Sequence, residues 1–509
     1  MELQSKNAEI VIGIVARLGV DTKQVVTTIS EELKLYDYKV IEVKATDEIQ
    51  GFSEQLKLVN SPTAERYKSY IEGCNTLRRD LNRNDVMARF AIAGIVSARD
   101  GASTLERTAY IVNQIKRPEE FELLRSVYGE HYIQISCHAH ETQRIARLSR
   151  MIVRDHPDKP KSAEWELSAR SLISDDEDQE DVKHGQRLRK AFSLSDVVLD
   201  VTTSELALLQ TERFFRSLFG DNSVTPTRNE YGMDLANTAA QRSSDLSRQV
   251  GAAILNDKME VQALGCNEVG KFGGGTYWEG DPGDSREFQL GADANEERKR
   301  AVLMDLMVRL QRAGGLSDTL SSSEDIHKFL FDRVDDTIAD AQVMDSLEYG
   351  RSVHAEMNAI TDAARGGHAI RDCRLFSNTF PCHNCAKHIV ASGISEVIYL
   401  HPYPKSYARE LFNDSILIDP ARPSKDRLVF KQFVGITGPM YSRVFTKSRW
   451  KREGGVVAKF DKSTAHYIRR TPIPAYEQVE VILLDELHTE LRSKGYLGDD
   501  EPIPEVRPQ

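Results

Sequence analysis

The sequence predicts an α/β protein of more than one domain, with a parallel sheet in its N-terminal part. Three observations support this fold class. A chain of 509 residues is too long for one hydrophobic core. From the N-terminus to about residue 202, apolar stretches such as IVIGIV and HYIQISC alternate with amphipathic stretches such as RPEEFELLRSVYG. Strands that are separated by helices of this length form parallel sheets with helices on both faces.

The expected domain boundaries follow changes in composition. The stretch FGDNSVTPTRNEYGMD (219–234) is rich in Gly, Asn, Thr and Pro, which is typical of a connection. The segment 270–350 reads as a long insertion in the second domain, and the acidic run 174–185 as an exposed loop of the first. The predicted first domain, linker, second domain and tail lie at 1–218, 219–233, 234–497 and 498–509.

Composition narrows the class of protein. The net charge is −11 (67 − 78), so broad electrostatic capture of nucleic acid is not expected. The sequence has no apolar run of about 18 residues and no basic segment before its first apolar stretch, which argues against membrane spans and secretion. We therefore expect a cytoplasmic protein with no membrane partner. In such a compartment six cysteines, two of them in one C-x-x-C, indicate metal or redox chemistry rather than disulfides.

One segment combines metal-ligand residue types with a carboxylate. His354 and Glu356 lie two positions apart, and Cys382 and Cys385 follow 28 positions after the histidine (382 − 354). Two predicted helices would each carry one pair on a single face. One imidazole and two thiolates make three zinc ligands and leave a fourth position open for water, which is the catalytic pattern. We expect one zinc ion per chain, with Glu356 moving protons between water, the ring nitrogen and the departing ammonia.

A structural zinc site is the alternative interpretation of the same cysteines. Such a site needs a fourth protein ligand. This alternative does not explain why a glutamate, Glu356, lies two positions after His354. Four residues could supply the ligand, namely Cys266, Cys373, His383 and His388.

The motif matches the zinc deaminase signature H-x-E…P-C-x-x-C. Together with RSSDLSRQVGAAILND, ALGCNEV and PCHNCAKHIVASGISEVIY, it resembles the deoxycytidylate deaminase family over roughly 234–410. The resemblance implies a cytidine deaminase-like, three-layer α/β/α domain. It also implies that Asn267 hydrogen-bonds the nucleotide, where the alternative is a plain turn residue. Tyr403 and Lys405 could face the base and the phosphate, or form a turn with a solvated lysine.

The N-terminal strand, turn and helix, IVIGIVARLGVDTKQV, stand where a nucleotide kinase carries its phosphate-binding loop. A working loop reads G-x-x-x-x-G-K-[ST]. Gly13 and Gly19 are the candidate phosphate-binding residues, but Val20 and Asp21 stand where the lysine and the hydroxyl residue belong. We therefore predict a degenerate, regulatory P-loop kinase-like domain without phosphoryl transfer. The helix N-terminus there could still bind an anion.

The pairing of these two domains resembles the AvcD-type family of anti-phage deoxycytidylate deaminases. Outside the zinc motif the resemblance rests on IVNQIKRPEEFELLRSVYG, ELALLQTERFFRSLFGDN and YPKSYARELFNDSI. It implies conversion of dCMP and dCTP to dUMP and dUTP, which depletes dCTP during phage infection. It also implies a small RNA antitoxin as partner. Deoxycytidylate deaminases of this kind form homo-oligomers, often hexamers.

Two other functions remain open from the sequence. A polynucleotide deaminase acting on tRNA or single-stranded DNA shares the zinc motif, and needs a basic groove with aromatic platforms. The stretch FTKSRWKRE (445–453) could form a local basic patch. A regulatory protein that senses a nucleotide or RNA through its front domain is the other possibility.

Overall fold

The chain forms two compact units, Met1–Tyr231 with Gln432–Gln509 and Gly232–Lys431, which are described separately. Within the described ranges, no helix combines the length and the hydropathy that a membrane span requires. The expected tail at 498–509 lies outside these ranges except for Gly498. The computed structural model describes residues 9–99, 107–158, 163–179, 182–331, 341–403, 405–422, 424, 426–447, 459–467 and 476–498.

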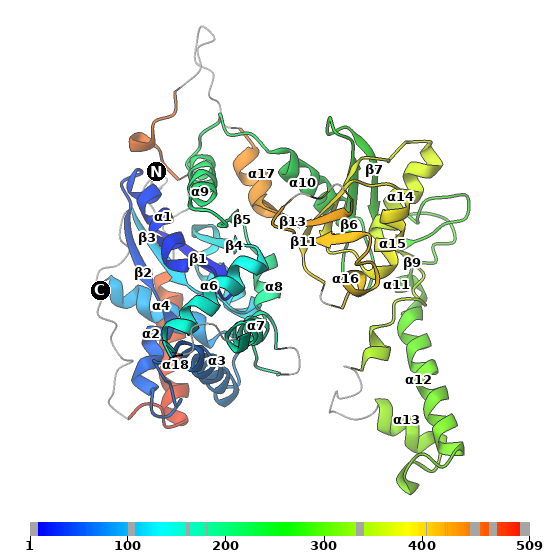
Figure 1. Cartoon of the computed structure of the whole chain (residues 1–509), viewed down its shortest axis with the longest axis horizontal. Coiled ribbons are helices and arrows are strands. Elements are labelled where there is room, and N and C mark those ends of the chain that lie inside the picture. The colour runs from blue at the N-terminus through cyan, green and yellow to red at the C-terminus, as the bar shows by residue number, and fades with distance from the viewer. Residues whose placement is uncertain are drawn as a thin grey trace. The chain divides into compact units, whose positions relative to one another are not determined.

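A six-stranded sheet forms the centre of the first unit (Figure 1). In sheet order its strands are β14 (Gly435–Ile436), β5 (Val197–Asp200), β4 (Tyr132–His138), β1 (Ile10–Ala16), β3 (Thr108–Asn113) and β2 (Lys39–Val43). The five strands β5, β4, β1, β3 and β2 run parallel, and β14 pairs antiparallel with β5. Every residue of β1 and β4 is buried, as expected for central strands covered on both faces. The predicted parallel sheet is therefore confirmed.

Helices cover this sheet. One core cluster joins α1, α9 and α17 to the strands through residues such as Ile29, Phe214 and Met440. The C-terminal α18 contacts α4 and α5. The helices of the first unit are α1 (Thr22–Lys34), α2 (Ala45–Glu48), α3 (Thr63–Asp80), α4 (Val86–Ala98), α5 (Pro118–Tyr128), α6 (Glu141–Arg154), α7 (Ala163–Glu177), α8 (Leu188–Ser193), α9 (Ser204–Leu218), α17 (Pro439–Phe445) and α18 (Tyr476–Ser493).

The end of the chain completes the first unit rather than the second. Strand β14 extends the first sheet, and Arg99 donates hydrogen bonds to both Glu9 at 2.9 Å and Glu480 of α18 at 3.1 Å. All three side chains are buried, so α18 is fastened to the core. The second unit therefore ends at Lys431, and the expected boundary at 497 is corrected.

The turn after β1 does not have the form of a phosphate-binding loop. Gly13 lies inside β1, and a Cβ there would lie 2.9 Å from Cζ of Tyr132. Gly19 has a φ of +90°, and a Cβ there would lie 2.8 Å from the backbone carbonyl carbon of Arg144 in α6. Both glycines thus permit close packing. This corrects the phosphate contact that the sequence predicted for Gly13.

The N-terminus of α1 already has an anion of the chain's own. The Asp21 carboxylate accepts a hydrogen bond from the backbone N–H of Gln24 at 3.2 Å and pairs with Arg147 at 2.6 Å. The acidic run 174–185, which was expected to be an exposed loop, is partly helical and partly buried in its described residues. Its first residues end α7, and the buried Asp176 accepts from the backbone N–H of Leu18 at 2.9 Å.

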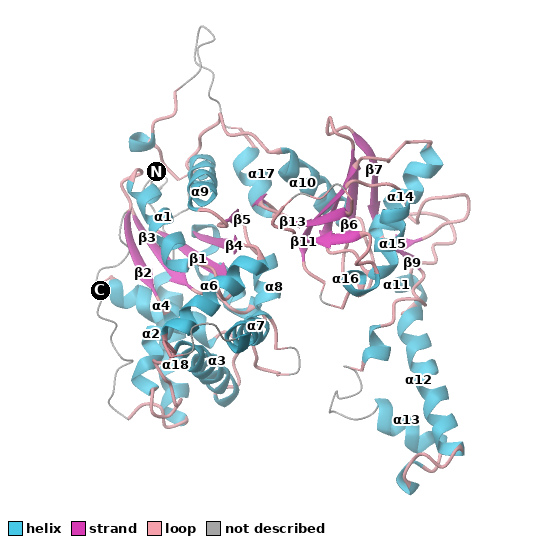
Figure 2. Ribbon diagram, in the orientation of Figure 1, coloured by secondary structure: helices cyan, strands magenta, loops and turns pink. Residues whose placement is uncertain are grey.

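The second unit has a mixed six-stranded sheet (Figure 2). In sheet order its strands are β12 (Ile416–Ile418), β13 (Leu428–Gln432), β11 (Glu396–His401), β10 (Arg374–Thr379), β6 (Gly251–Leu255) and β7 (Val261–Cys266). Strands β10 and β11 are parallel, whereas β6 is antiparallel to both β10 and β7. Its helices are α10 (Arg228–Ala240), which begins in the first unit, α11 (Glu287–Leu290), α12 (Ala294–Arg312), α13 (Ser323–Phe331), α14 (Ala355–Gly366), α15 (His383–Ala391) and α16 (Ala408–Leu411).

Two glycines identify the two covered faces of this sheet. A Cβ at Gly251 in β6 would lie 2.9 Å from Cα of Ala240 in α10. A Cβ at Gly265 in β7 would lie 2.5 Å from the backbone nitrogen of Ala359 in α14. Gly265 is the pairing partner of Ala252, so these glycines point to opposite faces. The unit is therefore a three-layer α/β/α sandwich, as predicted.

The expected insertion 270–350 leaves and re-enters this sandwich through a two-stranded ladder. Strand β8 (Glu268–Val269) pairs antiparallel with β9 (Ser352–Val353). Between them, α12 and α13 share a small cluster of apolar side chains that includes Leu303 and Ile326. Residues 332–340 lie outside the described ranges.

Candidate active site

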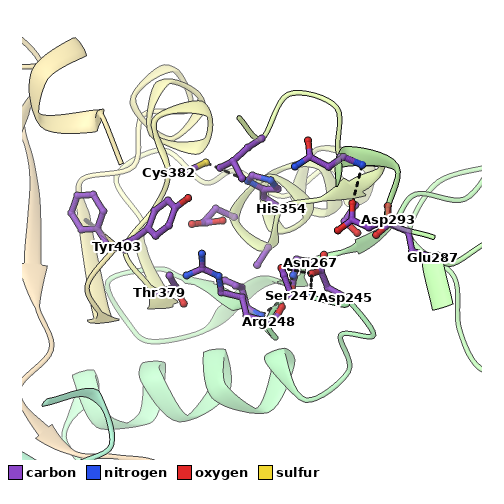
Figure 3. A pocket seen from close by; sticks show the side chains of 18 residues that line it. Asp245, Ser247, Arg248, Asn267, Glu287, Asp293, His354, Thr379, Cys382 and Tyr403 are labelled. Carbon is purple, nitrogen blue, oxygen red and sulfur yellow. Dashed lines mark hydrogen bonds between the residues drawn. The ribbon is translucent and has the colours of Figure 1, made fainter. Parts of the chain in front are cut away.

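A cavity of about 140 Å³ in the second unit contains the motif residues (Figure 3). Its floor comes from the start of α14, with His354 and Glu356, and from Cys382 before α15. Asn267 and Arg248 come from the segments beside β7 and β6. The sandwich thus brings segments that are distant in the sequence to one point.

His354, Cys382 and Cys385 form a compact group of metal-ligand atoms. The two sulfur atoms lie 3.3 and 3.4 Å from Nδ1 of His354, and all three ligand atoms lie within 4.8 Å of one another. Zinc–sulfur and zinc–nitrogen bonds of about 2.3 and 2.0 Å place tetrahedral ligands about 3.5 Å apart. The observed separations fit a tetrahedral zinc site.

The fold places these ligands at two helix N-termini. His354 is the N-cap residue of α14, and Cys382 is the N-cap residue of α15 after Pro381. The positive end of a helix dipole stabilises thiolate at such a position. Hydrogen bonds from Cys385 and His354 accordingly lower the pKa of Cys382.

Glu356 lies in the first turn of α14 and is buried. Burial is the largest cause that raises its pKa, to about 7, and the Cys382 thiolate adds to the effect. A carboxyl group with a pKa near neutrality can both accept and release a proton at physiological pH.

The structural-site alternative is not supported by the geometry. Among the residues that the structure describes, the metal-ligand group that contains His354 has no fourth His, Cys, Asp or Glu member. The four residues considered above as a fourth ligand, Cys266, Cys373, His383 and His388, are therefore not part of it.

Asn267 lies in the cavity wall, but its side chain is engaged by the backbone. Its Oδ1 accepts from the N–H of Val250 at 2.7 Å, and its Nδ2 donates to the carbonyl of Arg248 at 2.8 Å. Asn267 therefore positions the segment that carries Arg248. Direct contact with a nucleotide remains a prediction for this residue.

The two residues predicted after β11 have different places. Tyr403 lines the cavity, whereas Lys405 does not belong to the lining and pairs with Asp345. Arg248 was missed by the sequence reasoning, although its guanidinium lies 4.6 Å from the ring centre of Tyr403. A cation three residues before a buried strand was the signal for it.

The insertion also contributes to the cavity wall, and its position in the sequence between Asn267 and His354 had suggested a place at the site or at a subunit contact. Residues from two parts of the insertion, 287–295 and 347–350, line the cavity. Asn295 connects them, because its Nδ2 donates to the carbonyl of Ser346 at 2.9 Å. The contributing residues are Glu287, Asp293, Asn295, Leu347 and Gly350.

Comparison with known proteins agrees with this geometry. Residues 226–401 match the family model of the cytidine and deoxycytidylate deaminase zinc-binding region, which is about a third of the chain. The chain is 43% identical over 54 residues to the deoxycytidylate deaminase of Enterobacteria phage T2, which is 11% of this chain and 29% of that protein. It therefore spans less than a third of this phage relative's length. The chain contains a dCMP deaminase-like domain.

Two further likenesses cover a larger share of the chain. The deoxycytidylate deaminase of Mus musculus is 26% identical over 219 residues, which is 42% of this chain and 82% of that protein. The crystal structure of the dCMP deaminase from cyanophage S-TIM5 in complex with dCMP and dUMP is 17% identical. The aligned residues make up 41% of this chain and 98% of the cyanophage chain, and the TM-score is 0.22.

Proposed function

We propose that this protein is a zinc-dependent deaminase of deoxycytidine nucleotides, which converts dCMP, dCTP or both to dUMP and dUTP. One observation carries the proposal. His354 and Cys382, which form a ligand group with Cys385, line the same cavity as the buried Glu356. Three protein ligands with a proton-transfer group beside them are what metal-assisted hydrolysis requires.

The residues of the site have two roles, metal binding and proton transfer. His354, Cys382 and Cys385 would hold the zinc ion, which supplies Lewis-acid activation of water when bound. Glu356 takes the proton from the attacking water and delivers protons to the ring nitrogen N3 and to the departing amino group. Water and cytosine thereby become uracil and ammonia. Burial of Glu356 holds its pKa at about 7, which suits this exchange.

Arg248 favours a nucleotide over a free base. It has no ion pair with a described carboxylate, and it lies at the cavity beside Tyr403. A guanidinium group there can bind a phosphate, while the tyrosine ring offers a face to the base. The basic stretch 445–453, on which the polynucleotide alternative relied, is described only at 445–447 and follows the second unit.

Further proposals rest on the resemblance to AvcD-type anti-phage deaminases. We propose that deamination depletes dCTP in a phage-infected cytoplasm, and that the first unit is a regulatory P-loop kinase-like domain. We also propose that a small RNA restrains the enzyme and that the protein works as a homo-oligomer, such as a hexamer. The parallel strand order of the first unit is consistent with the kinase-like part of this proposal.

The test is the Glu356→Ala variant, assayed with dCMP, dCTP, CMP, CTP and cytosine-containing oligonucleotides. We expect zinc at the wild-type stoichiometry and no formation of uracil product, because all three ligands remain while the proton carrier is lost. Loss of zinc from this variant would show that Glu356 is a ligand. Wild-type turnover of oligonucleotides but not of mononucleotides would reject the proposed substrate class.

A further inference from the structure

The first unit has a cavity of its own, of about 260 Å³, at the carboxyl ends of β1, β2 and β3. From β1 the chain passes β3 to reach β2, and from β3 it passes β1 to reach β4. The connections therefore leave the neighbouring strands β1 and β3 in opposite directions. In open parallel sheets, ligands bind outside the carboxyl ends of strands at such a point.

The lining of this cavity is cationic. It includes five basic side chains and two acidic ones, which is an excess of three (5 − 2). Both acids are already neutralised, because Arg78 pairs with Glu120 at 2.9 Å and Lys116 pairs with Asp176 at 2.7 Å. The three other basic side chains are Arg17, Lys44 and Arg66.

Arg66 stands out among the basic side chains. It forms no ion pair with a carboxylate in the described part of the chain, and its guanidinium lies 5.7 Å from the ring centre of Tyr67 and 5.1 Å from that of Tyr70. Both tyrosines line the same cavity. A cation beside aromatic rings is suited to a ligand that carries an anionic group and a planar ring.

Four residues that line this cavity also have a buried polar side-chain atom without a hydrogen-bond partner among the described residues. Nε of Arg17 and Nε of Arg78 are donors, while Oδ1 of Asn113 and Oε1 of Gln186 are acceptors. Buried polar groups are costly when unpaired, so the packing around this cavity is not optimised for stability alone.

We propose that this cavity is a second ligand site, which binds a nucleoside monophosphate without phosphorylating it. The phosphate would accept from Arg66, and the base would lie against the ring of Tyr67 or Tyr70. The volume is close to the lower end of the range for small-ligand sites, about 300–1,000 Å³, and suits a mononucleotide. Transfer is not part of the proposal, because Asp21 occupies the helix N-terminus that a transferred phosphate would need.

Calorimetric titration of the full-length protein with AMP, GMP, dTMP, UMP and inorganic phosphate tests this site. None of these carries cytosine, so the proposed deaminase does not consume them. We expect saturable binding of at least one nucleotide, one per chain and tighter than about 1 mM. The Arg66→Ala variant should weaken it at least about tenfold. Arg79→Ala, which alters an exposed residue of the same helix outside the lining, should leave it unchanged.

Tyr67 supplies a second pair of variants. Tyr67→Ala should weaken binding, whereas Tyr67→Phe should retain it because the aromatic face remains. Three results would overturn the proposal: no nucleotide binds, Arg66→Ala binds as the wild type does, or inorganic phosphate binds as tightly as any nucleotide. None of these results depends on deamination, and a Cys385→Ser background would separate this site from the cavity of the second unit.

Discussion

Each unit has a cavity at one edge of its sheet, and the two cavities differ in the kinds of side chain that line them. In the second unit two sulfur atoms and one imidazole nitrogen converge on a single point, with a buried carboxyl group beside them. In the first unit no such group of ligands lines the cavity in the described ranges. Its wall instead has unpartnered donors and acceptors. The arrangement in the second unit is suited to chemistry, and the arrangement in the first unit is suited to recognition.

The largest effect should come from removing a metal ligand, which tests the chemical half of this comparison. Cys385→Ser should lower zinc affinity and deaminase activity together, each by at least about 100-fold. Even changes to residues beside a metal ligand lower affinity or activity by about 10–100-fold. Cys373→Ser is the matched control, because Cys373 is also buried in this unit but is not in the ligand group. Zinc content by mass spectrometry and uracil formation are the measurements. Equal losses in both variants would mean that the cysteines act through packing.

A large effect on stability is expected from Arg99 in the first unit. Arg99→Met leaves the carboxylates of Glu9 and Glu480 buried without their cation. Breaking a buried ion pair from one side costs about 3–5 kcal/mol. Arg79→Met, at an exposed pair with Asp80, should cost less than about 1 kcal/mol.

Hydrogen exchange in increasing urea would measure the free energy of unfolding of each unit from its own peptides. We expect peptides from β1 and α18 to lose protection together in Arg99→Met, while peptides from the second unit keep theirs. If α18 alone became unprotected, the C-terminal helix would be an accessory of the first unit and not part of its core.

The difference between the units also explains what the sequence could predict. His354 with Glu356, and Cys382 with Cys385, are each closely spaced at a helix N-terminus, so local geometry predicts each pair. That the two pairs meet was predicted from the match to the zinc deaminase signature. The cavity of the first unit draws on Arg17, Arg66 and Asn113, among others, and only the sheet order brings these segments together. No local spacing encodes that arrangement.

The same reason accounts for the corrected expectations. Gly13 belongs to a motif-like spacing, yet it lies inside β1, where a glycine leaves room for the side chain of the adjacent Tyr132. The boundary at 497 was wrong because β14 returns to an edge that opened more than 200 residues earlier at β5 (435 − 200 = 235). For Lys405 the sequence left a phosphate contact and a solvated turn open, and it did not indicate the ion pair with Asp345 of the insertion. Long-range pairings of this kind leave no mark on the local sequence.

A smaller effect is expected at the contact that positions α14 in the second unit. In Gly265→Ala the new Cβ would overlap the carbonyl oxygen of Ala355 and lie 2.5 Å from the backbone nitrogen of Ala359. The helix must move, and it carries Glu356. A displacement of about 1 Å can cost about 100-fold in rate. In the control, Gly270→Ala, the new Cβ would lie 3.6 Å from Val353, and activity should be kept. Unchanged kcat/KM in Gly265→Ala would show that α14 tolerates this displacement.

The last effect is gradual, a pH dependence of stability that should be confined to the first unit. Glu48 at the end of α2 is buried, and burial, followed by the charge of Asp47, raises its pKa to about 8. Its ordinary pKa is 4.5, so between pH 4.5 and 8 the folded unit holds a proton that the unfolded chain has released. The stability from this group is complete below pH 4.5 and is lost as the pH rises through 8. The slope cannot exceed about 1.4 kcal/mol per pH unit.

Glu48→Gln should remove this slope and stabilise the first unit at pH 8. Hydrogen exchange at pH 5, 6.5 and 8, corrected for intrinsic exchange rates, would measure the stability. A slope that persists in Glu48→Gln, or that appears equally in peptides from the second unit, would assign the dependence to other groups.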